Sequence, residues 1–409
     1  MTGIDRIRHE AAARFAQLGF PTTRDEEWRF TSVAPIARTR FSPASAVLTG
    51  WSDGQLEEAL CPTAEGFRMV FVNGRYSRKL STRKPLHGLS AAPLRGGNGN
   101  IEVHLARYAD YRNRAFVALN TANFEDGASI EIPARTIVAE PIHLVFLATG
   151  GDTPVASHPR TLIIVGADSH ATVVESYLGR GPQYFTNAVT EIVAGNHSVV
   201  DHYKLQDEDE RSFHVTTLHV ELGPDASFST HSISIGGGLV RNDVNTVLEQ
   251  GTEATVNGFY LASGSQHIDN HTAIDHAQPH GTSHELYKGI LGGRAAAVFN
   301  GRIVVRPGAQ KTDAKQTNKN LLLSEDATIN TKPELQIWAD DVRCTHGATI
   351  GQLDPDAIFY LQSRGIGQEE ARNLLTHAFA RDIIDRIRVE PLRAHIERKL
   401  RERLHASRN

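Results

Sequence analysis

The sequence predicts a mainly β protein whose core is a right-handed parallel β-helix, flanked by N-terminal and C-terminal helical segments. Three observations carry this prediction: a short motif that recurs at nearly constant intervals, β-branched runs between its copies, and helical periodicity confined to the chain ends. Regular spacing in the twenties to forties marks a repeat architecture. We expect an N-terminal helical or mixed domain over residues 1–99, the β-helix over 100–362 and a helical region over 363–409.

The N-terminal stretch predicts an amphipathic helix, because its apolar side chains recur at three- and four-residue steps. These residues are Ile4, Ile7, Ala11, Phe15 and Leu18. A second helix start is predicted at Thr23, with Glu26 completing a capping box. We interpret the acidic residues before Trp28 as a favourable interaction with the helix dipole rather than as an acid–base or metal cluster. The Gly- and Asn-rich residues 96–100 mark a domain boundary.

The copies of the repeat begin at Gly166, Gly195, Gly223 and Gly251, so the intervals between them are almost equal. Each copy starts with Gly and places an apolar residue at its sixth position. We expect each Gly to supply the positive φ of a corner between two strands. A propeller needs roughly 40–45 residues per blade, much more than this interval provides.

The C-terminal region predicts a helix with one apolar stripe. The stripe contains Ala371, Leu374, Leu375, Ala378, Phe379, Ile383, Ile384 and Ile387. Residues 381–409 hold nine Lys and Arg against five Asp and Glu, a net charge of +4. We interpret this basic segment as a solvated helical face.

Composition excludes several classes of protein. The 43 Lys and Arg against 47 Asp and Glu argue against a nucleic-acid binder. No apolar run approaches the ~20 residues of a membrane helix, so no membrane association is expected. The N-terminus shows no apolar signal region, and two cysteines, Cys61 and Cys344, build no disulfide framework. We expect a cytoplasmic protein.

The strongest candidate site is the segment 332–349. In a strand, alternate residues share a face, so Asp340, Val342, Cys344, His346, Ala348 and Ile350 are expected to lie together. A thiolate and an imidazole two residues apart can both reach an iron, zinc or copper ion. Alternatively, this is the apolar face of the strand, and Cys344 packs as a small hydrophobe.

The number of ligands that an iron–sulfur cluster needs limits what this chain can bind alone. An iron–sulfur cluster usually takes four thiolates, with imidazole as an occasional replacement. Cys61 lies far before Cys344 in the sequence, in a different predicted unit. Any cluster chemistry must therefore be shared with another subunit.

Two other sequence features give less support for a functional site. The histidines at 267, 271, 276, 280 and 284 are expected to scatter over different faces of a β-helix rather than form one metal site. No Walker sequence occurs, so we expect no ATP site in this chain.

With these motifs the sequence resembles the SufB/SufD family, the scaffold subunits of SUF iron–sulfur cluster assembly. The resemblance rests on Glu26-Glu27-Trp28, on the repeats, on Gln316–Leu323 and above all on Ala339–Gly351. SufB carries a Glu-His-Glu-Ala-Thr-like run where this chain has Cys344–Thr349, and an upstream cysteine that Gln316–Ser324 lacks. The chain is therefore closer to the SufD type.

The resemblance implies a non-catalytic scaffold in a SufBCD complex. Such a subunit pairs with SufB through the β-helical core, or with a second copy of itself in isolation. It docks the SufC ATPase through its C-terminal helices, here with Leu374, Leu375, Ala378 and Phe379. His346 matches the family histidine implicated in cluster formation, with Cys344 beside it. His346 is thus an expected iron ligand, and a transient iron–sulfur cluster is expected to be shared with SufB.

Three alternatives remain at this stage. The chain is a SufB-like paralogue, or a β-helix polysaccharide lyase or hydrolase, since a fold does not fix a function. The third is a purely structural partner that takes no part in iron chemistry.

Overall fold

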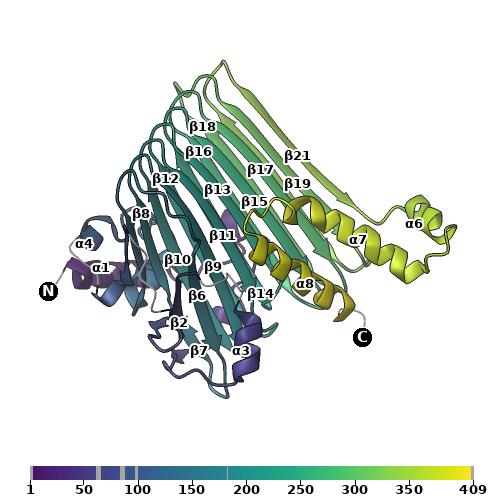
Figure 1. The fold of residues 1–409 in the computed structure, drawn as a ribbon, viewed down its shortest axis with the longest axis horizontal. Helices are drawn as coiled ribbons and strands as arrows, with labels where there is room; N and C mark the ends of the chain where they lie inside the picture. The colour runs from purple at the N-terminus through teal and green to yellow at the C-terminus, as the bar shows by residue number, and fades with distance from the viewer. Residues whose placement is uncertain (1–2, 61–65, 83–87, 97–99, 182, 407–409) are drawn as a thin grey trace.

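The core of the molecule is a solenoid in which two β-sheets face each other (Figure 1). The computed structural model describes residues 3–60, 66–82, 88–96, 100–181 and 183–406. Each coil of chain adds one strand to sheet A and the next strand to sheet B, so neighbouring strands in a sheet are two apart in sequence order. The predicted mainly β fold with a parallel β-helix and terminal helices is confirmed.

Sheet A has the spatial order β20-β18-β16-β14-β12-β10-β8-β5-β4. Its strands are β4 (Ser90–Pro93), β5 (Gly127–Ile132), β8 (Arg160–Val165), β10 (Tyr184–Ala194), β12 (Phe213–Leu222), β14 (Leu239–Leu248), β16 (His267–His276), β18 (Ala296–Val305) and β20 (Thr328–Ile337), with β1 (Ser42–Pro43) and β7 (Val155–Ser157) at its side.

Sheet B has the order β21-β19-β17-β15-β13-β11-β9-β6-β2-β3. Its strands are β2 (Arg68–Val72), β3 (Arg75–Tyr76), β6 (Ile142–Thr149), β9 (His170–Arg180), β11 (Val199–Asp207), β13 (Ser227–Ser234), β15 (Glu253–Ala262), β17 (Thr282–Leu291), β19 (Asp313–Leu322) and β21 (Arg343–Gly351). The pairs β2–β3 and β4–β5 are antiparallel, whereas the stacked coils pair in parallel.

Strand register gives the true length of each coil. Val199 pairs with Ser227, which is the interval that the sequence repeat predicted. The next step in the same sheet, from Ser227 to Glu253, is shorter, whereas a later step, from Thr282 to Asp313, is longer. Corner loops absorb these differences, so the strand ladder stays in register although the sequence period varies.

Three of the four repeat glycines do not adopt the positive φ that the sequence predicted for them. The residues with positive φ at these corners are Asp168, His197, Asp225 and Gly251. Gly166, Gly195 and Gly223 stand two positions earlier, where a Cβ would lie only 2.4, 2.7 and 2.8 Å from atoms of the preceding corner. At Gly166 and Gly195 the close atoms are backbone atoms, so the stacking of successive corners requires glycine there, whereas at Gly223 the nearest atom belongs to the Asn196 side chain. Only Gly251 supplies the left-handed corner itself.

The predicted capping box at Thr23 is wrong. The backbone and hydroxyl of Thr22 donate to Asp25, and only a short 3₁₀ turn, η1 (Glu26–Trp28), follows. Trp28 then packs on Phe116 and under the Arg241 guanidinium, 4.2 Å from the ring centroid. Contacts with the solenoid therefore set the path of this segment.

The N-terminal helices cover sheet A, and the C-terminal helices cover sheet B (Figure 1). The first group contains α1 (Gly3–Leu18), α2 (Ala34–Arg38), α4 (Asn100–His104) and α5 (Ala115–Asn123), with η2 (Leu94–Gly96). Helix α3 (Asp53–Ala59) packs by Leu56 on the first strands of sheet B. The predicted N-terminal helix is α1.

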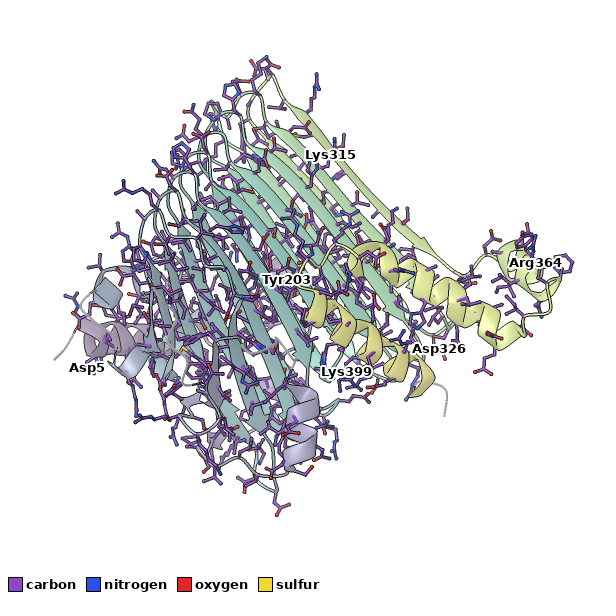
Figure 2. The ribbon with its side chains drawn as sticks, viewed as in Figure 1. Asp5, Tyr203, Lys315, Asp326, Arg364 and Lys399 are labelled. Carbon is purple, nitrogen blue, oxygen red and sulfur yellow. The ribbon has the colours of Figure 1, made fainter. Side chains whose placement is uncertain are left out.

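Helices α7 (Gln368–Ile384) and α8 (Glu390–Ala406) lie on the outer face of sheet B, while α6 (Pro355–Gln362) stands clear of the sheets. The Tyr203 hydroxyl accepts from the backbone of Arg388 at the α7–α8 turn, and Lys399 and Arg403 of α8 pair with Asp207 (Figure 2). Lys399 and Arg403 of the predicted basic face are thus bound to the solenoid, whereas Arg381 and Arg386 pair with carboxylates of α7 and its C-cap.

The sequence places domain boundaries at 99/100 and 362/363, but the two sheets already include strands before residue 99, and the last strand ends before residue 362. Strands β2 and β4 belong to the two sheets although they precede residue 99, and helices α4 and α5 follow it. The last strand ends at Gly351, before α6. In the described part of the chain, no helix combines the length and the apolar character needed to cross a membrane.

A buried ion pair fastens the N-terminal layer to sheet A. The Glu191 carboxylate accepts from Arg160 at 2.6 Å and from the backbone amides of Ala106, Tyr108 and Ala109 at 2.9 Å. Both charged side chains are fully buried. Removal of this carboxylate therefore leaves an uncompensated guanidinium in the interior.

We expect Glu191→Ala to lower the free energy of unfolding by about 3–5 kcal/mol. The measurement is urea unfolding of the full chain, with Glu221→Ala as the control. Glu221 pairs with His219 and is partly exposed, so its removal is expected to change stability by less than about 1 kcal/mol. Equal effects of the two substitutions would contradict this account.

Candidate functional site at the open end of the solenoid

Strands β20 and β21 form the end of the solenoid, because each is the terminal strand of its sheet. Among the residues that the structure describes, no strand lies beyond them, so one edge of each carries unpaired backbone groups. Most residues of β21 are exposed, in contrast to the buried strands that precede it. Such an edge is a template for pairing with a strand of another chain.

Cys344 and His346 lie side by side on the inner face of this last strand. Cys344 pairs with the buried Ala314, and His346 pairs with the buried Gln316. The predicted common face is thus found for these two residues and for Ala348 and Ile350, whereas Asp340 lies in the corner before β21.

The two predicted site residues differ in their surroundings. Cys344 is half-buried and packs against the solenoid core together with Val342. Burial raises the pKa of the Cys344 thiol, which keeps the sulfur protonated in the free chain. His346 is exposed on the last described coil. The imidazole is therefore available to a partner. The thiol packs against the core as a small hydrophobe, which was the second interpretation of the sequence.

Large apolar side chains surround this end of the solenoid. Trp338 is 57% exposed, Ile350 51% and Ile337 38%. Ile337 and Ile350 stand in register with the buried Val305 and Asn320, so their positions are covered by the next coil elsewhere in the solenoid, while Trp338 directly follows β20. Their exposure together at both sheet ends makes this end of the solenoid a candidate interaction surface.

Beneath His346 the interior is polar. Gln316 donates to the Glu285 carboxylate at 2.6 Å, and both side chains are buried. The same ladder continues through Val256 and Thr230 to His202. The sequence reasoning missed Glu285, because the position of a carboxylate inside a strand of unknown register gives no sign of its burial.

The four residues predicted to dock a partner on α7 separate into two groups. Leu374 is 46% exposed and Ala378 is exposed, whereas Leu375 is half-buried. Phe379 packs toward sheet B, where the Lys288 ammonium lies 4.1 Å from its ring centroid. Phe359 and Tyr360 of the neighbouring α6 are 70% and 55% exposed and were not predicted. These two helices thus carry a second exposed apolar surface.

The clustered histidines lie on different faces, as expected. His267 and His271 contact the N-terminal segment outside sheet A, His276 faces the interior, and His284 is exposed on sheet B. Cys61 lies outside the described residues, so its position relative to Cys344 stays untested.

Comparison with known proteins decides the family. Residues 146–379 match the family model described as SUF system FeS cluster assembly, SufBD core domain, and residues 1–144 match the SufBD protein N-terminal region. The chain belongs to the SufBD family. The predicted resemblance is thereby confirmed, and the two matched regions meet near residue 145.

Several relatives match over most of the chain. An iron–sulfur cluster assembly SufBD family protein of Synechocystis is 37% identical over 406 residues, covering 95% of this chain and 88% of the relative. SufD of Escherichia coli is 30% identical over 390 residues, covering 94% and 90%. SufD of Bacillus subtilis is 30% identical over 297 residues, covering 69% and 66%. The chain therefore belongs to a family of iron–sulfur cluster assembly proteins.

The buried Glu285 predicts a pH dependence of stability. Burial raises the pKa of this carboxyl to about 7, from roughly 4.3 in the unfolded chain. Between these values the folded state holds a proton that the unfolded state has released. Stability is therefore lost as pH rises from about 4.5 through 7, and changes no further above that.

We expect the stability of the wild type relative to Glu285→Gln to fall between pH 5 and pH 8. Urea unfolding at several pH values measures this difference. The control is Glu253→Gln on the adjacent strand β15, where the carboxylate is exposed. A constant difference between wild type and Glu285→Gln across this range would show that Glu285 ionises normally.

Proposed function

We propose that this protein is a non-catalytic scaffold subunit of a cytoplasmic SUF complex. It pairs with SufB through the open end of the solenoid and docks the SufC ATPase through its C-terminal helices. The observation that carries the proposal is the uncovered inner face of β21, where an exposed imidazole lies among exposed apolar side chains. The family membership supports the same reading.

Ligand number supports sharing of the cluster between subunits. At the open end this chain offers His346 and the half-buried thiol of Cys344, fewer than the four ligands that a cluster usually takes. A neutral imidazole binds iron through one ring nitrogen, and thiolates of SufB complete the set. The iron–sulfur cluster is then a transient cargo of the interface, held by both chains.

The C-terminal helices provide a mechanical link between the two surfaces. Helix α7 packs on β15 and β17, and the Asp382 carboxylate of α7 accepts from Lys288 of β17 at 3.0 Å. Strand β17 pairs with β19, which pairs with β21. Movement of α6 and α7 by a docked ATPase is therefore transmitted over two strands to His346.

The first test concerns His346. We expect His346→Ala to leave assembly with SufB and SufC intact but to lower the iron and sulfide content of the purified complex by about tenfold, the scale expected when a metal site loses a ligand or its support. The control is His284→Ala, which removes an exposed imidazole from the outer face of the same sheet. Unchanged iron and sulfide in His346→Ala would favour a purely structural partner.

The second test separates the two docking surfaces. Ile350→Glu places a charge on the open end, and Leu374→Glu places one on α7; both side chains are exposed, so the fold is expected to tolerate them. In co-purification, Ile350→Glu is expected to lose SufB but retain SufC, and Leu374→Glu to do the reverse. Each variant is the control for the other. Retention of both partners by either variant would contradict the surface assigned to it.

A further inference from the structure

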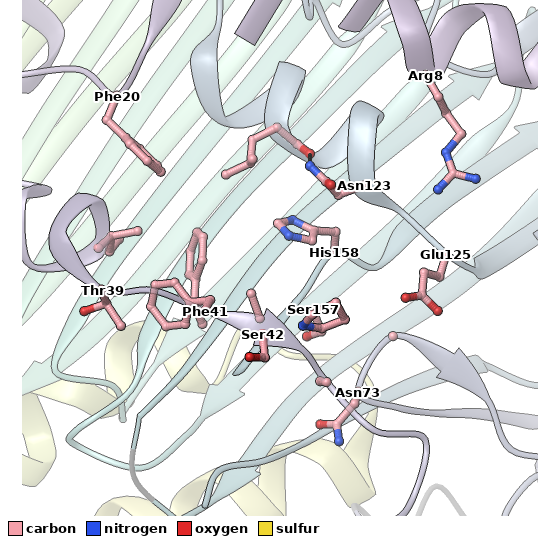
Figure 3. Close-up of a pocket in the computed structure, with 17 residues that line it drawn as sticks. Arg8, Phe20, Thr39, Phe41, Ser42, Asn73, Asn123, Glu125, Ser157 and His158 are labelled. Atoms are coloured by element: carbon pink, nitrogen blue, oxygen red, sulfur yellow. Dashed lines mark hydrogen bonds between the residues drawn. The ribbon is translucent and has the colours of Figure 1, made fainter. Parts of the chain in front are cut away.

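A cavity of about 410 Å³ lies between the N-terminal layer and sheet A (Figure 3). Its walls come from α1, the segment 36–44, the end of α5 and strands β7 and β10. Strands β12, β14, β16 and β18 separate it from the edge strand β20. A cavity of this size falls in the range of small-molecule sites, roughly 300–1,000 Å³.

One side of the cavity is apolar and largely aromatic. Phe20, Phe41 and Phe185 line it together with Ile36 and Leu119. The rings of Phe41 and Phe185 lie 5.6 Å apart between centroids, tilted by 43°. Such walls favour a flat apolar body, because aromatic pairs gain from offset and edge-to-face contacts.

His158 presents a hydrogen-bond donor to the cavity. Asn187 Nδ2 lies 3.3 Å from His158 Nδ1 and also donates to the carbonyl of Phe116, so Nδ1 accepts. Burial lowers the pKa of His158 to about 4, and a neutral imidazole with an accepting Nδ1 carries its proton on Nε2. Within the described residues this Nε2–H has no partner, and Figure 3 shows the ring at the centre of the cavity.

The polar side of the cavity carries one guanidinium and one carboxylate. Arg8 and Glu125 lie together at this side (Figure 3). The Glu125 carboxylate is already paired with Arg75, and this pairing lowers its pKa. Arg8 donates from Nε to the carbonyl of Ala122 at 3.4 Å, while its two terminal nitrogens have no hydrogen-bond partner in the part of the chain that the structure describes. An anionic group can therefore bind there without displacing an existing ion pair.

We propose that this cavity binds a small organic anion with a flat apolar body, of the aromatic carboxylate or sulfonate class. The rings pack among Phe20, Phe41 and Phe185, the acid group pairs with Arg8, and an acceptor atom receives the proton of His158 Nε2. Because its walls come from both the N-terminal layer and the solenoid, the bound ligand links the two. The proposal does not depend on the role of His346.

The test uses 8-anilinonaphthalene-1-sulfonate, whose fluorescence rises in apolar surroundings, and its uncharged counterpart N-phenyl-1-naphthylamine. We expect the sulfonate to saturate a single site on the full chain and to raise the melting temperature, since a ligand of the folded state stabilises it. Arg8→Gln is expected to weaken sulfonate binding about tenfold, the scale of a charge-assisted hydrogen bond, and to leave binding of the uncharged probe unchanged. Arg6→Gln, on the exposed side of the same helix, is the control.

Two further variants locate the binding site. Leu119→Trp fills the cavity from α5, and Ala156→Leu narrows it from β7; either is expected to remove saturable binding, with folding checked by circular dichroism. Loss of sulfonate binding in a folded variant of this pair, together with the Arg8 effect, supports the proposal. Undiminished binding in both would place the probe on another surface and overturn it. Equal sensitivity of both probes to Arg8→Gln would overturn the assignment of an anion.

Discussion

Parallel hydrogen bonding between successive coils is the constraint on which the rest of this molecule depends. Each strand from β8 to β19 has a neighbour on both sides, so its backbone groups are satisfied and its inner face is covered. The ladder also sets where corners stack, and a side chain at Gly166 or Gly195 would collide with the backbone of the preceding corner. A solenoid of this kind has no internal reason to stop. Its last coil must be closed by something else or left uncovered.

In the described part of this chain the last coil is left uncovered. Helices α7 and α8 pack on the outer face of sheet B and do not cover the inner face of β21. Cys344, His346 and Ile350 thus occupy positions that are buried in the coils before them, which explains how an interior ladder ends in an exposed imidazole. The polar pair Gln316–Glu285 lies directly below. A second SufBD chain that continues both sheets would satisfy the free edges and cover the apolar side chains in one step.

The outer layers fasten to the solenoid through charges as well as through apolar packing. Glu191 with Arg160 anchors the N-terminal layer, while Asp382 with Lys288 and Asp207 with Arg403 anchor the C-terminal helices. The His158 cavity lies at the N-terminal junction, and the C-terminal junction leads to α6 and its exposed aromatic residues. The two layers therefore offer separate points at which a ligand or a partner can act on one rigid core.

The sequence alone determined the repeat architecture, the helical ends and the position of Cys344 and His346 on the same face of one strand. These features follow from local periodicity: alternation in a strand, three- and four-residue steps in a helix, and a Gly-led motif at each corner. Only the tertiary structure decided which glycines take a positive φ, that the chain around Thr23 forms a short turn, and that Phe379 faces the solenoid while Leu374 does not. The tertiary structure also decided which titratable side chains are buried. Glu285 and His158 have ordinary sequence surroundings, and their chemistry depends on distant strands and helices, which no local pattern records.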